Sequence, residues 1–176
     1  VPARTLVAAL EARLSTCQRM DRLRPAQLER ATAQGEHIEL QLRTEAGIRT
    51  THCKLLVAAD GSDSPIREQW GIGVQREDYA QTAVVCSAQT EHAHGGQAFE
   101  RFTDDGPFAL LPLSDNRLGV VCTLPTEFAL EAQHFDDQQY LQLLQARFGF
   151  RLGKFIRVGR RQTWPLRLAV AERVTD

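Results

Sequence analysis

The residues with the clearest capacity for chemistry are Asp60, Ser64 and Arg67, which lie close together in segment 60–67. A carboxylate, a hydroxyl and a guanidinium at this spacing can bind a ligand through charge-assisted hydrogen bonds. Gly61 lets the backbone turn sharply, and a serine of the segment can cap a helix that follows. The pattern predicts a strand-turn-helix junction that holds an anionic ligand. The alternative is a plain connector in which Asp60 makes only turn hydrogen bonds.

Four cysteines and one close histidine pair are the other candidates for nucleophilic or metal chemistry. The cysteines form no Cys-x-x-Cys pair, so we interpret them as reduced, mostly buried thiols. His92 and His94 could share one strand face, but no third ligand is near, so we expect a solvated loop and no metal site. His134 also reads as an exposed loop residue, which leaves the catalytic residues unassigned. The cysteines are Cys17, Cys53, Cys86 and Cys122.

The elements around the Asp60 segment are predicted from the distribution of apolar residues. The unbroken apolar run Leu55–Ala59 is typical of a strand buried on both faces, as in a parallel sheet. A short helix is expected over Ser64–Trp70, ending at the glycines that follow. Leucines at four-residue spacing predict an earlier helix over Thr5–Cys17. Arg4 lies at the entry of that helix, where a cation and backbone N–H groups can share an anionic ligand.

The rest of the chain reads mainly as strands and turns. Alternation over His37–Arg43 predicts a half-buried strand, and Ile48–Ala59 is expected to return as its partner. Later short strands indicate an antiparallel meander, and Asp136–Phe148 reads as an amphipathic helix. The predicted fold class is α/β (α+β), with a soft division into 1–73 and 74–176. The other strand candidates are Gln18–Leu23, Ala26–Ala33, Ala80–Glu91, Gln97–Thr103, Pro107–Ser114, Arg117–Pro125, Lys154–Val158 and Gln162–Val170.

Bulk composition excludes several classes of function. The 176 residues are 43% hydrophobic and 24% charged, which is ordinary for a globular protein. A net charge of -1 gives no electrostatic basis for binding nucleic acid or an anionic membrane surface. No apolar stretch approaches the roughly 20 residues that span a bilayer. The chain starts at Val1 without an initiator methionine and ends abruptly at Asp176, so we expect a fragment of a longer protein.

Three blocks of sequence carry a resemblance to a known family. The pattern Asp-Gly-x-x-Ser-x-Ile-Arg at 60–67, after Val-Ala-Ala, resembles the DG motif of the group A FAD-dependent aromatic hydroxylases. The blocks Gly96–Thr103 and Gly106–Asp115 are similar to the ubiquinone-biosynthesis branch of that family, and Phe148–Lys154 continues the match. The resemblance covers nearly the whole chain. It implies a remnant of a Rossmann-like FAD domain joined to a largely antiparallel substrate-domain sheet with flanking helices.

The resemblance also implies a reaction and a cofactor site. The cofactor is FAD, NAD(P)H is the co-substrate, and O2 is captured as a flavin C4a-hydroperoxide that hydroxylates a prenylated phenol. Asp60, Gly61, Ser64 and Arg67 are implied to lie near FAD, and Arg4 is implied to be a second contact. The family's Gly-x-Gly-x-x-Gly motif and its Gly-Asp motif have no counterpart here. We therefore expect a central fragment that is inactive alone and binds FAD weakly or not at all.

The substrate pocket is predicted from strand periodicity. Phe108, Leu110 and Pro112 share one side of a nearly all-apolar strand, so we take them as pocket candidates. The alternative for each of them is the hydrophobic core.

Partners and location follow only from the resemblance. It implies a cytoplasmic protein, peripheral at the inner membrane where prenylated phenols reside, and a ubiquinone-biosynthesis multienzyme complex as partner. No nucleic-acid partner is expected. Two other functions stay open. One is a non-catalytic module that binds a prenyl-quinone or a protein, and the other is a sister hydroxylase acting at another ring position.

Overall fold

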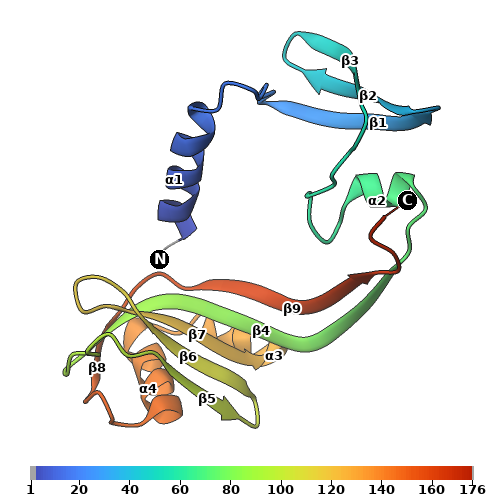
Figure 1. Cartoon of the computed structure of the whole chain (residues 1–176). Coiled ribbons are helices and arrows are strands. Elements are labelled where there is room, and N and C mark those ends of the chain that lie inside the picture. Colours follow the sequence, from blue (N-terminus) through green and yellow to red (C-terminus); the bar gives the residue numbers. More distant parts are fainter. Residues whose placement is uncertain (1–2, 176) are drawn as a thin grey trace. The chain divides into compact units, whose positions relative to one another are not determined.

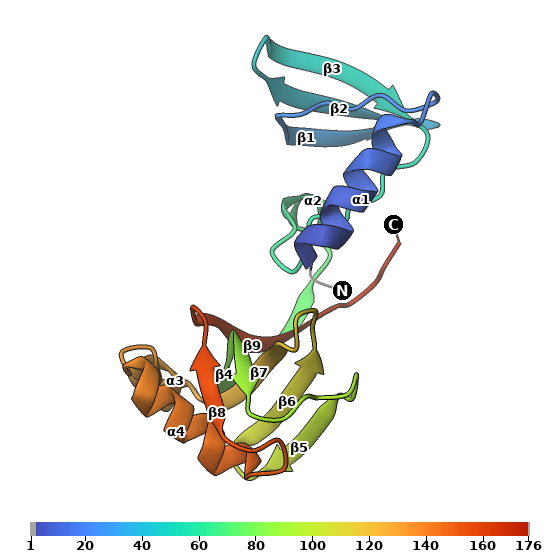
Figure 2. The ribbon, with the colours of Figure 1, turned by 90° about the vertical axis from the view of Figure 1, so that its left-hand side faces the viewer.

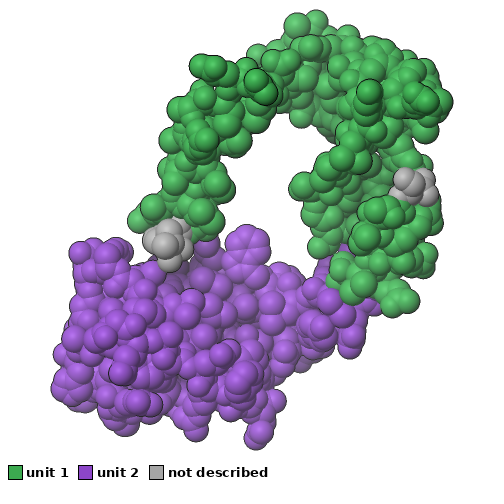
Figure 3. Space-filling view, in the orientation of Figure 1, with its two compact units in different colours: residues 1–75, 169–176 green, residues 76–168 purple. Residues whose placement is uncertain are grey.

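The chain divides into two compact units (Figure 3). The structure is a computed structural model that describes residues 3–175. Unit 1 comprises residues 1–75 and 169–176, and unit 2 comprises residues 76–168. The sequence placed the division after residue 73 and gave no sign that 169–176 returns to unit 1. The return is held by the backbone of Glu172, whose N–H donates to the carbonyl oxygen of Gly73 at 3.0 Å.

Unit 1 contains a three-stranded antiparallel meander of order β1-β2-β3 (Figure 1). The alternation in His37–Arg43 correctly predicts β2, which pairs with both neighbours. The strand candidate Gln18–Leu23 is wrong, because this segment forms turns and irregular backbone. Its Arg22 pairs with Glu11 of the preceding helix instead of joining a sheet. The elements are α1 (Ala3–Ser15), β1 (Ala26–Gln34), β2 (His37–Thr44), β3 (Gly47–Cys53) and α2 (Pro65–Gln69).

The apolar run Leu55–Ala59 is not the buried parallel strand that the sequence predicts. Strand β3 ends at Cys53, and the run itself is irregular. Leu55 and Val57 are 76% and 73% exposed. A parallel strand forms only against a neighbouring strand, and no strand of the described chain pairs with this run. The apolar stripe of α1 is uncovered in the same way, since its leucines are exposed.

Unit 2 is built on one antiparallel sheet of order β5-β6-β7-β4-β8, with β9 also paired to β4. The predicted meander holds for β5, β6 and β7, but β4 pairs with β7 and not with β5. Helix α4 was predicted, whereas the short helix α3 was missed. The elements are β4 (Val74–Thr90), β5 (Phe99–Thr103), β6 (Gly106–Pro112), β7 (Leu118–Pro125), α3 (Thr126–Ala132), α4 (Asp137–Phe148), β8 (Phe155–Val158) and β9 (Gln162–Ala171).

Helix α4 is defined at both ends by local hydrogen bonds. The side chain of Asp136 accepts from the backbone N–H of Gln139 at 2.7 Å, and the Gln139 side chain accepts from the backbone N–H of Asp136 at 2.9 Å. This reciprocal capping box satisfies N–H groups that the first turn leaves free. Gly149 ends the helix with a φ of 83°, a conformation that L side chains rarely adopt.

The hydrophobic core of unit 2 lies between the sheet and helices α3 and α4, which sit together on one side of the sheet (Figure 2). Alternate residues of each strand point toward the helices, as the period of two requires. Tyr140 and Leu144 of α4 are fully buried against them. The strand residues of this core are Val84, Cys86, Ala88, Phe108, Leu110, Leu118, Val120, Cys122, Leu124, Phe155 and Val158.

Candidate functional site

The Asp60 segment forms the predicted turn and helix start. Gly61 adopts a φ of 90°, so the sharp turn uses the conformational freedom of glycine. Ser64 caps α2 by accepting from the backbone N–H of Arg67 at 3.0 Å, and Pro65 follows as the first helical residue. The Arg67 guanidinium donates to the carbonyl oxygen of Ser62 at 2.8 Å, which folds it back over the turn. The structure therefore brings together four of the predicted cofactor-site residues.

Asp60 is kept ionised by its neighbours. The Ser64 hydroxyl donates to the Asp60 carboxylate and lowers its pKa, with further lowering from backbone N–H groups and the charge of Arg67. Asp60 itself is exposed, while Ser64 is only 4% exposed. The turn thus presents an anionic acceptor to solvent while the serine that orients it is buried. Such a carboxylate can accept hydrogen bonds from the hydroxyl groups of a ligand.

The substitution Ser64→Ala is expected to raise the pKa of Asp60 toward that of an ordinary aspartate, because it removes the largest stabilising hydrogen bond. A lowered folded-state pKa stabilises the fold above the ordinary carboxyl pKa, and this stabilisation is lost as the pH falls through the folded-state value. Carboxyl-carbon NMR titration of Asp60 in both proteins measures the shift. Ser114→Ala is the control, because its side chain lies in another unit. An unchanged Asp60 titration midpoint in Ser64→Ala would refute the assignment.

Arg4 is not joined to this turn in the described part of the chain. It lies in the first turn of α1 and is exposed, and no hydrogen bond or ion pair between described residues links it to Asp60 or Arg67. Its proposed contact with FAD therefore stays a prediction.

The pocket candidates occupy different environments. Phe108 and Leu110 are 1% and 0% exposed and belong to the core beneath α4, while Pro112 is half-buried. Period-two counting placed them correctly on one side of β6, but helices cover that side. The helix-covered face cannot be read from the strand alone, so the core alternative describes Leu110 better than the pocket prediction. Phe108 also reaches a surface hollow that is described below.

The opposite side of the same sheet is apolar in its middle, carries Glu100 at its β5 edge, and is not covered by α3 or α4. We call it the open face. Cross-strand register aligns Ala109 with Val121 and Val121 with Val85, and a second row aligns Leu111 with Gly119. These residues are half-buried, apart from Leu111, which is 47% exposed. A smooth apolar surface of this kind suits a flat or chain-like apolar ligand. In the sequence, the open-face residues of β6 are Ala109 and Leu111, which alternate with the pocket candidates Phe108, Leu110 and Pro112.

A Cβ atom on Gly119 would meet its nearest neighbours, atoms of Leu111 and Leu113, at 3.7 Å. This is ordinary van der Waals contact, so the glycine is not needed for packing.

The cysteines and histidines of the described chain lie in separate environments. Burial raises the pKa of Cys86 to about 12 and that of Cys122 to about 11, so both thiols stay protonated and unreactive. Cys17 and Cys53 are half-buried, and all four cysteines are free. His94 is engaged in its loop, since its Nδ1 accepts from the Gly96 N–H at 2.9 Å. Among residues 3–175, no group of three potential metal ligands comes together.

The residues present fit part of an FAD molecule. The Asp60 turn offers an ionised acceptor that suits the hydroxyl groups of such a molecule. The sequence contains no glycine-rich strand-turn-helix for a pyrophosphate. None of the helices in the described chain is long and apolar enough to cross a membrane.

Comparison with known proteins gives a consistent result. A family model described as "FAD binding domain" matches residues 2–176. The chain is 36% identical over 181 residues to the ubiquinone hydroxylase UbiL of Rhodospirillum rubrum, covering 100% of this chain and 40% of that protein. It is 40% identical over 85 residues to 3-demethoxyubiquinol 3-hydroxylase of Escherichia coli, covering 48% of this chain and 22% of that protein. The chain thus spans less than half the length of these curated relatives.

Among solved structures, the fold matches the anhydrotetracycline hydroxylase OxyS of Streptomyces rimosus with a TM-score of 0.64 and 20% sequence identity. The match covers 100% of this chain and 35% of OxyS. At this identity the likeness shows the fold alone, and it agrees with the predicted mixed α/β architecture with antiparallel sheets.

Proposed function

This chain belongs to the FAD binding domain family, and on that premise we propose that it forms part of an FAD-dependent monooxygenase that hydroxylates a prenylated phenol in ubiquinone biosynthesis. The observation that carries the proposal is the match along the whole chain to a ubiquinone hydroxylase. The implied co-substrates are NAD(P)H and O2. When bound, FAD would supply the redox and oxygen-activating chemistry, and the chain's own residues would bind, orient and shield the reactants.

Two surfaces of the chain support this division of roles. The Asp60 carboxylate would accept hydrogen bonds from hydroxyl groups of FAD. Ser64 would orient the carboxylate, and Arg67 would add positive charge. The middle of the open face would bind the apolar substrate and exclude water from it, since Ala109, Leu111 and Val121 carry no charge, while Glu100 lies beside Ala109 at the β5 edge. The role proposed for these apolar residues is positioning.

The substrate is proposed at a finer level from sequence resemblance. From the resemblance of the blocks Gly96–Thr103 and Gly106–Asp115, we propose hydroxylation of 2-octaprenyl-6-methoxyphenol as the specific reaction. The similarity to an Escherichia coli protein named as a 3-hydroxylase keeps open a sister reaction at another ring position. We further propose that the whole protein works at the inner membrane, where its lipid-soluble substrate resides, and joins a ubiquinone-biosynthesis multienzyme complex.

The test compares the 176-residue chain with a protein in which it is joined to the flavin-binding segments of a longer relative. The joined protein should bind FAD and convert a prenylated phenol to the hydroxylated product with NAD(P)H and O2, as measured by mass spectrometry. The 176-residue chain alone should purify without a flavin absorbance band. A joined protein that binds FAD but hydroxylates no prenylated phenol would overturn the substrate. Prenyl-quinone binding by the short chain without flavin would favour the non-catalytic module.

A further inference from the structure

A surface hollow of about 630 Å³ lies in unit 2 at the edge of the sheet, apart from the open face. It is lined by Phe99, Arg101 and neighbouring residues in and just before β5, by Phe108 of β6, by Phe148 at the end of α4, and by Arg151 just beyond that helix. Its volume lies within the range of about 300–1,000 Å³ that is usual for small-molecule sites. The function proposed above makes no use of it. We call it the arginine hollow.

The floor of the arginine hollow is aromatic and well packed. The rings of Phe99 and Phe148 meet edge to face with centroids 5.5 Å apart, and those of Phe108 and Phe148 lie 6.2 Å apart. The Phe148 ring also meets the ring of Phe155, a core residue, edge to face, with centroids 5.9 Å apart. The floor is therefore anchored to the interior of unit 2 and presents fixed ring surfaces. Such surfaces favour aromatic ligands, which stack or pack edge to face on them.

The rim of the hollow carries two arginines whose charges are not neutralised. The Arg101 guanidinium donates one hydrogen bond to the backbone oxygen of Arg147 at 3.0 Å, and Arg151 lies over the Phe99 ring at 5.0 Å from its centroid. Neither forms an ion pair with a carboxylate among residues 3–175. The nearby Arg147, by contrast, forms an ion pair with Asp105, with 2.7 Å between its guanidinium nitrogen and the carboxylate oxygen. A guanidinium has five N–H donors, so most of the donors on Arg101 and Arg151 remain available.

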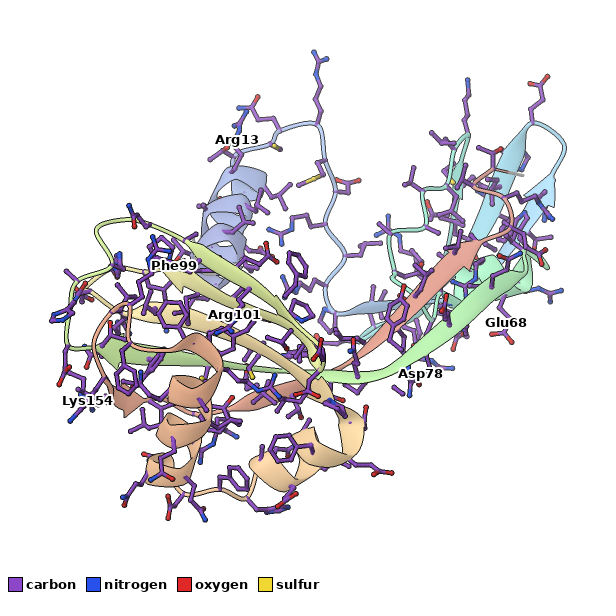
Figure 4. The ribbon with its side chains drawn as sticks, turned by 90° about the horizontal axis from the view of Figure 1, so that it is seen from below. Arg13, Glu68, Asp78, Phe99, Arg101 and Lys154 are labelled. Carbon is purple, nitrogen blue, oxygen red and sulfur yellow. The ribbon has the colours of Figure 1, made fainter. Side chains whose placement is uncertain are left out.

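The one acidic residue of the lining does not cancel this charge. Glu100 pairs with Ala109, which lies on the open face, whereas Phe99 and Arg101 pair with Leu110 and Phe108 of the helix-covered side. Successive strand residues point to opposite faces, so the Glu100 side chain projects away from the aromatic floor. Figure 4 shows Phe99 and Arg101 on the same strand, β5. The hollow therefore combines an apolar floor with a positively charged rim.

We propose that the arginine hollow binds a small aromatic carboxylate. The planar guanidinium fork of arginine matches a carboxylate in size and geometry, and the rings beneath would pack against the aromatic body. Structural roles for the two arginines, capping the end of α4 and stacking on Phe99, use only a small part of their hydrogen-bonding capacity. The site needs no flavin, so it stands independently of the monooxygenase function.

The test titrates the 176-residue chain with 2-naphthoate and follows the backbone amide signals of Phe99 and Arg151 by NMR. The neutral isostere 2-naphthamide should bind at least about tenfold more weakly, because it cannot form the charge-assisted pair. The variants Arg151→Gln and Arg101→Gln should each weaken naphthoate binding about tenfold. The matched control is Arg157→Gln, an exposed arginine of β8 outside the hollow, which should bind naphthoate like the unaltered chain.

Three results would overturn the proposal. Equal binding of naphthamide and naphthoate would remove the role of charge. Displacement of naphthoate by an equal concentration of inorganic phosphate would show a general anion site without aromatic selectivity. An equal loss of naphthoate affinity in Arg157→Gln and Arg151→Gln would indicate non-specific attraction between naphthoate and any arginine. Circular dichroism checks folding, and if Arg101→Gln unfolds because it loses its bond to α4, Arg151→Gln decides, since its side chain only stacks on Phe99.

Discussion

Replacing Leu111 by glutamate should reduce hydroxylation roughly 10- to 100-fold in an FAD-loaded protein that carries this chain, which corresponds to about 1.4–2.8 kcal/mol of transition-state stabilisation. Leu111 lies on the open face, which is proposed to bind the prenylated phenol. A carboxylate there would have to lose its hydration when an apolar substrate covers it. The side chain is 47% exposed in the chain by itself, so the substitution should leave folding intact. The measurement is kcat/KM with a prenylated phenol, together with circular dichroism.

Leu130→Glu is the matched control for that experiment. Leu130 is 55% exposed on α3, on the helix side of the sheet, so it receives the same chemical change at similar exposure. Its activity should stay within about twofold of the unaltered protein, because an exposed substitution away from a site changes little. Equal activity of the two variants would show that the open face does not contact the substrate. A fall in kcat/KM confined to Leu111→Glu would support the proposed substrate surface.

Leu144→Ala should destabilise unit 2 by about 2–5 kcal/mol, the usual cost of deleting a fully buried leucine side chain. Leu144 is 0% exposed and packs from α4 into the core beneath the sheet. The loss combines the transfer free energy of the missing methyl groups with the cavity left behind, since close-packed neighbours relax only partly. Urea denaturation followed by circular dichroism gives the difference in unfolding free energy.

Leu130→Ala serves as the comparison, because the same atoms are removed from an exposed position. Its expected effect is within about 0.5 kcal/mol. If both substitutions cost the same, α4 would not be packed on the sheet as described. Hydrogen exchange of the α4 backbone amides provides a second measurement, since protection there should fall only in Leu144→Ala.

The sequence predicted those elements whose signal is local. The alternation of His37–Arg43, the capping residue Asp136 and the glycine at 149 each determine an element through neighbouring residues, and each appears in the structure. The pairing of β4 with β7 depends on segments far apart in the chain, which no short pattern encodes. The run Leu55–Ala59 has the composition of a buried strand, but a strand also needs a partner, and composition carries no information about partners.

The same difference between local and long-range signals applies to the candidate site. The cluster of Asp60, Ser64 and Arg67 could be predicted, because a turn and a helix cap are determined within a few residues. The uncovered side of β6 could not, since period two separates the two sides of the strand but does not tell which side the helices cover. Leu110 and Leu111 are neighbours in sequence, and one is fully buried while the other is about half exposed. Only the tertiary packing of α4 distinguishes them.

The uncovered run Leu55–Ala59 also has a consequence for the colloidal behaviour of the chain. It is an uncharged, apolar window outside the named strands with Leu55 and Val57 exposed, a composition that favours edge-to-edge pairing with a copy of itself. In a parallel, in-register stack of copies, Lys54 would lie against Lys54 and Asp60 against Asp60, and this repulsion of like charges would oppose stacking. The aspartate of the proposed ligand turn would thus also limit aggregation. Neutralising it should lower the concentration at which the chain precipitates.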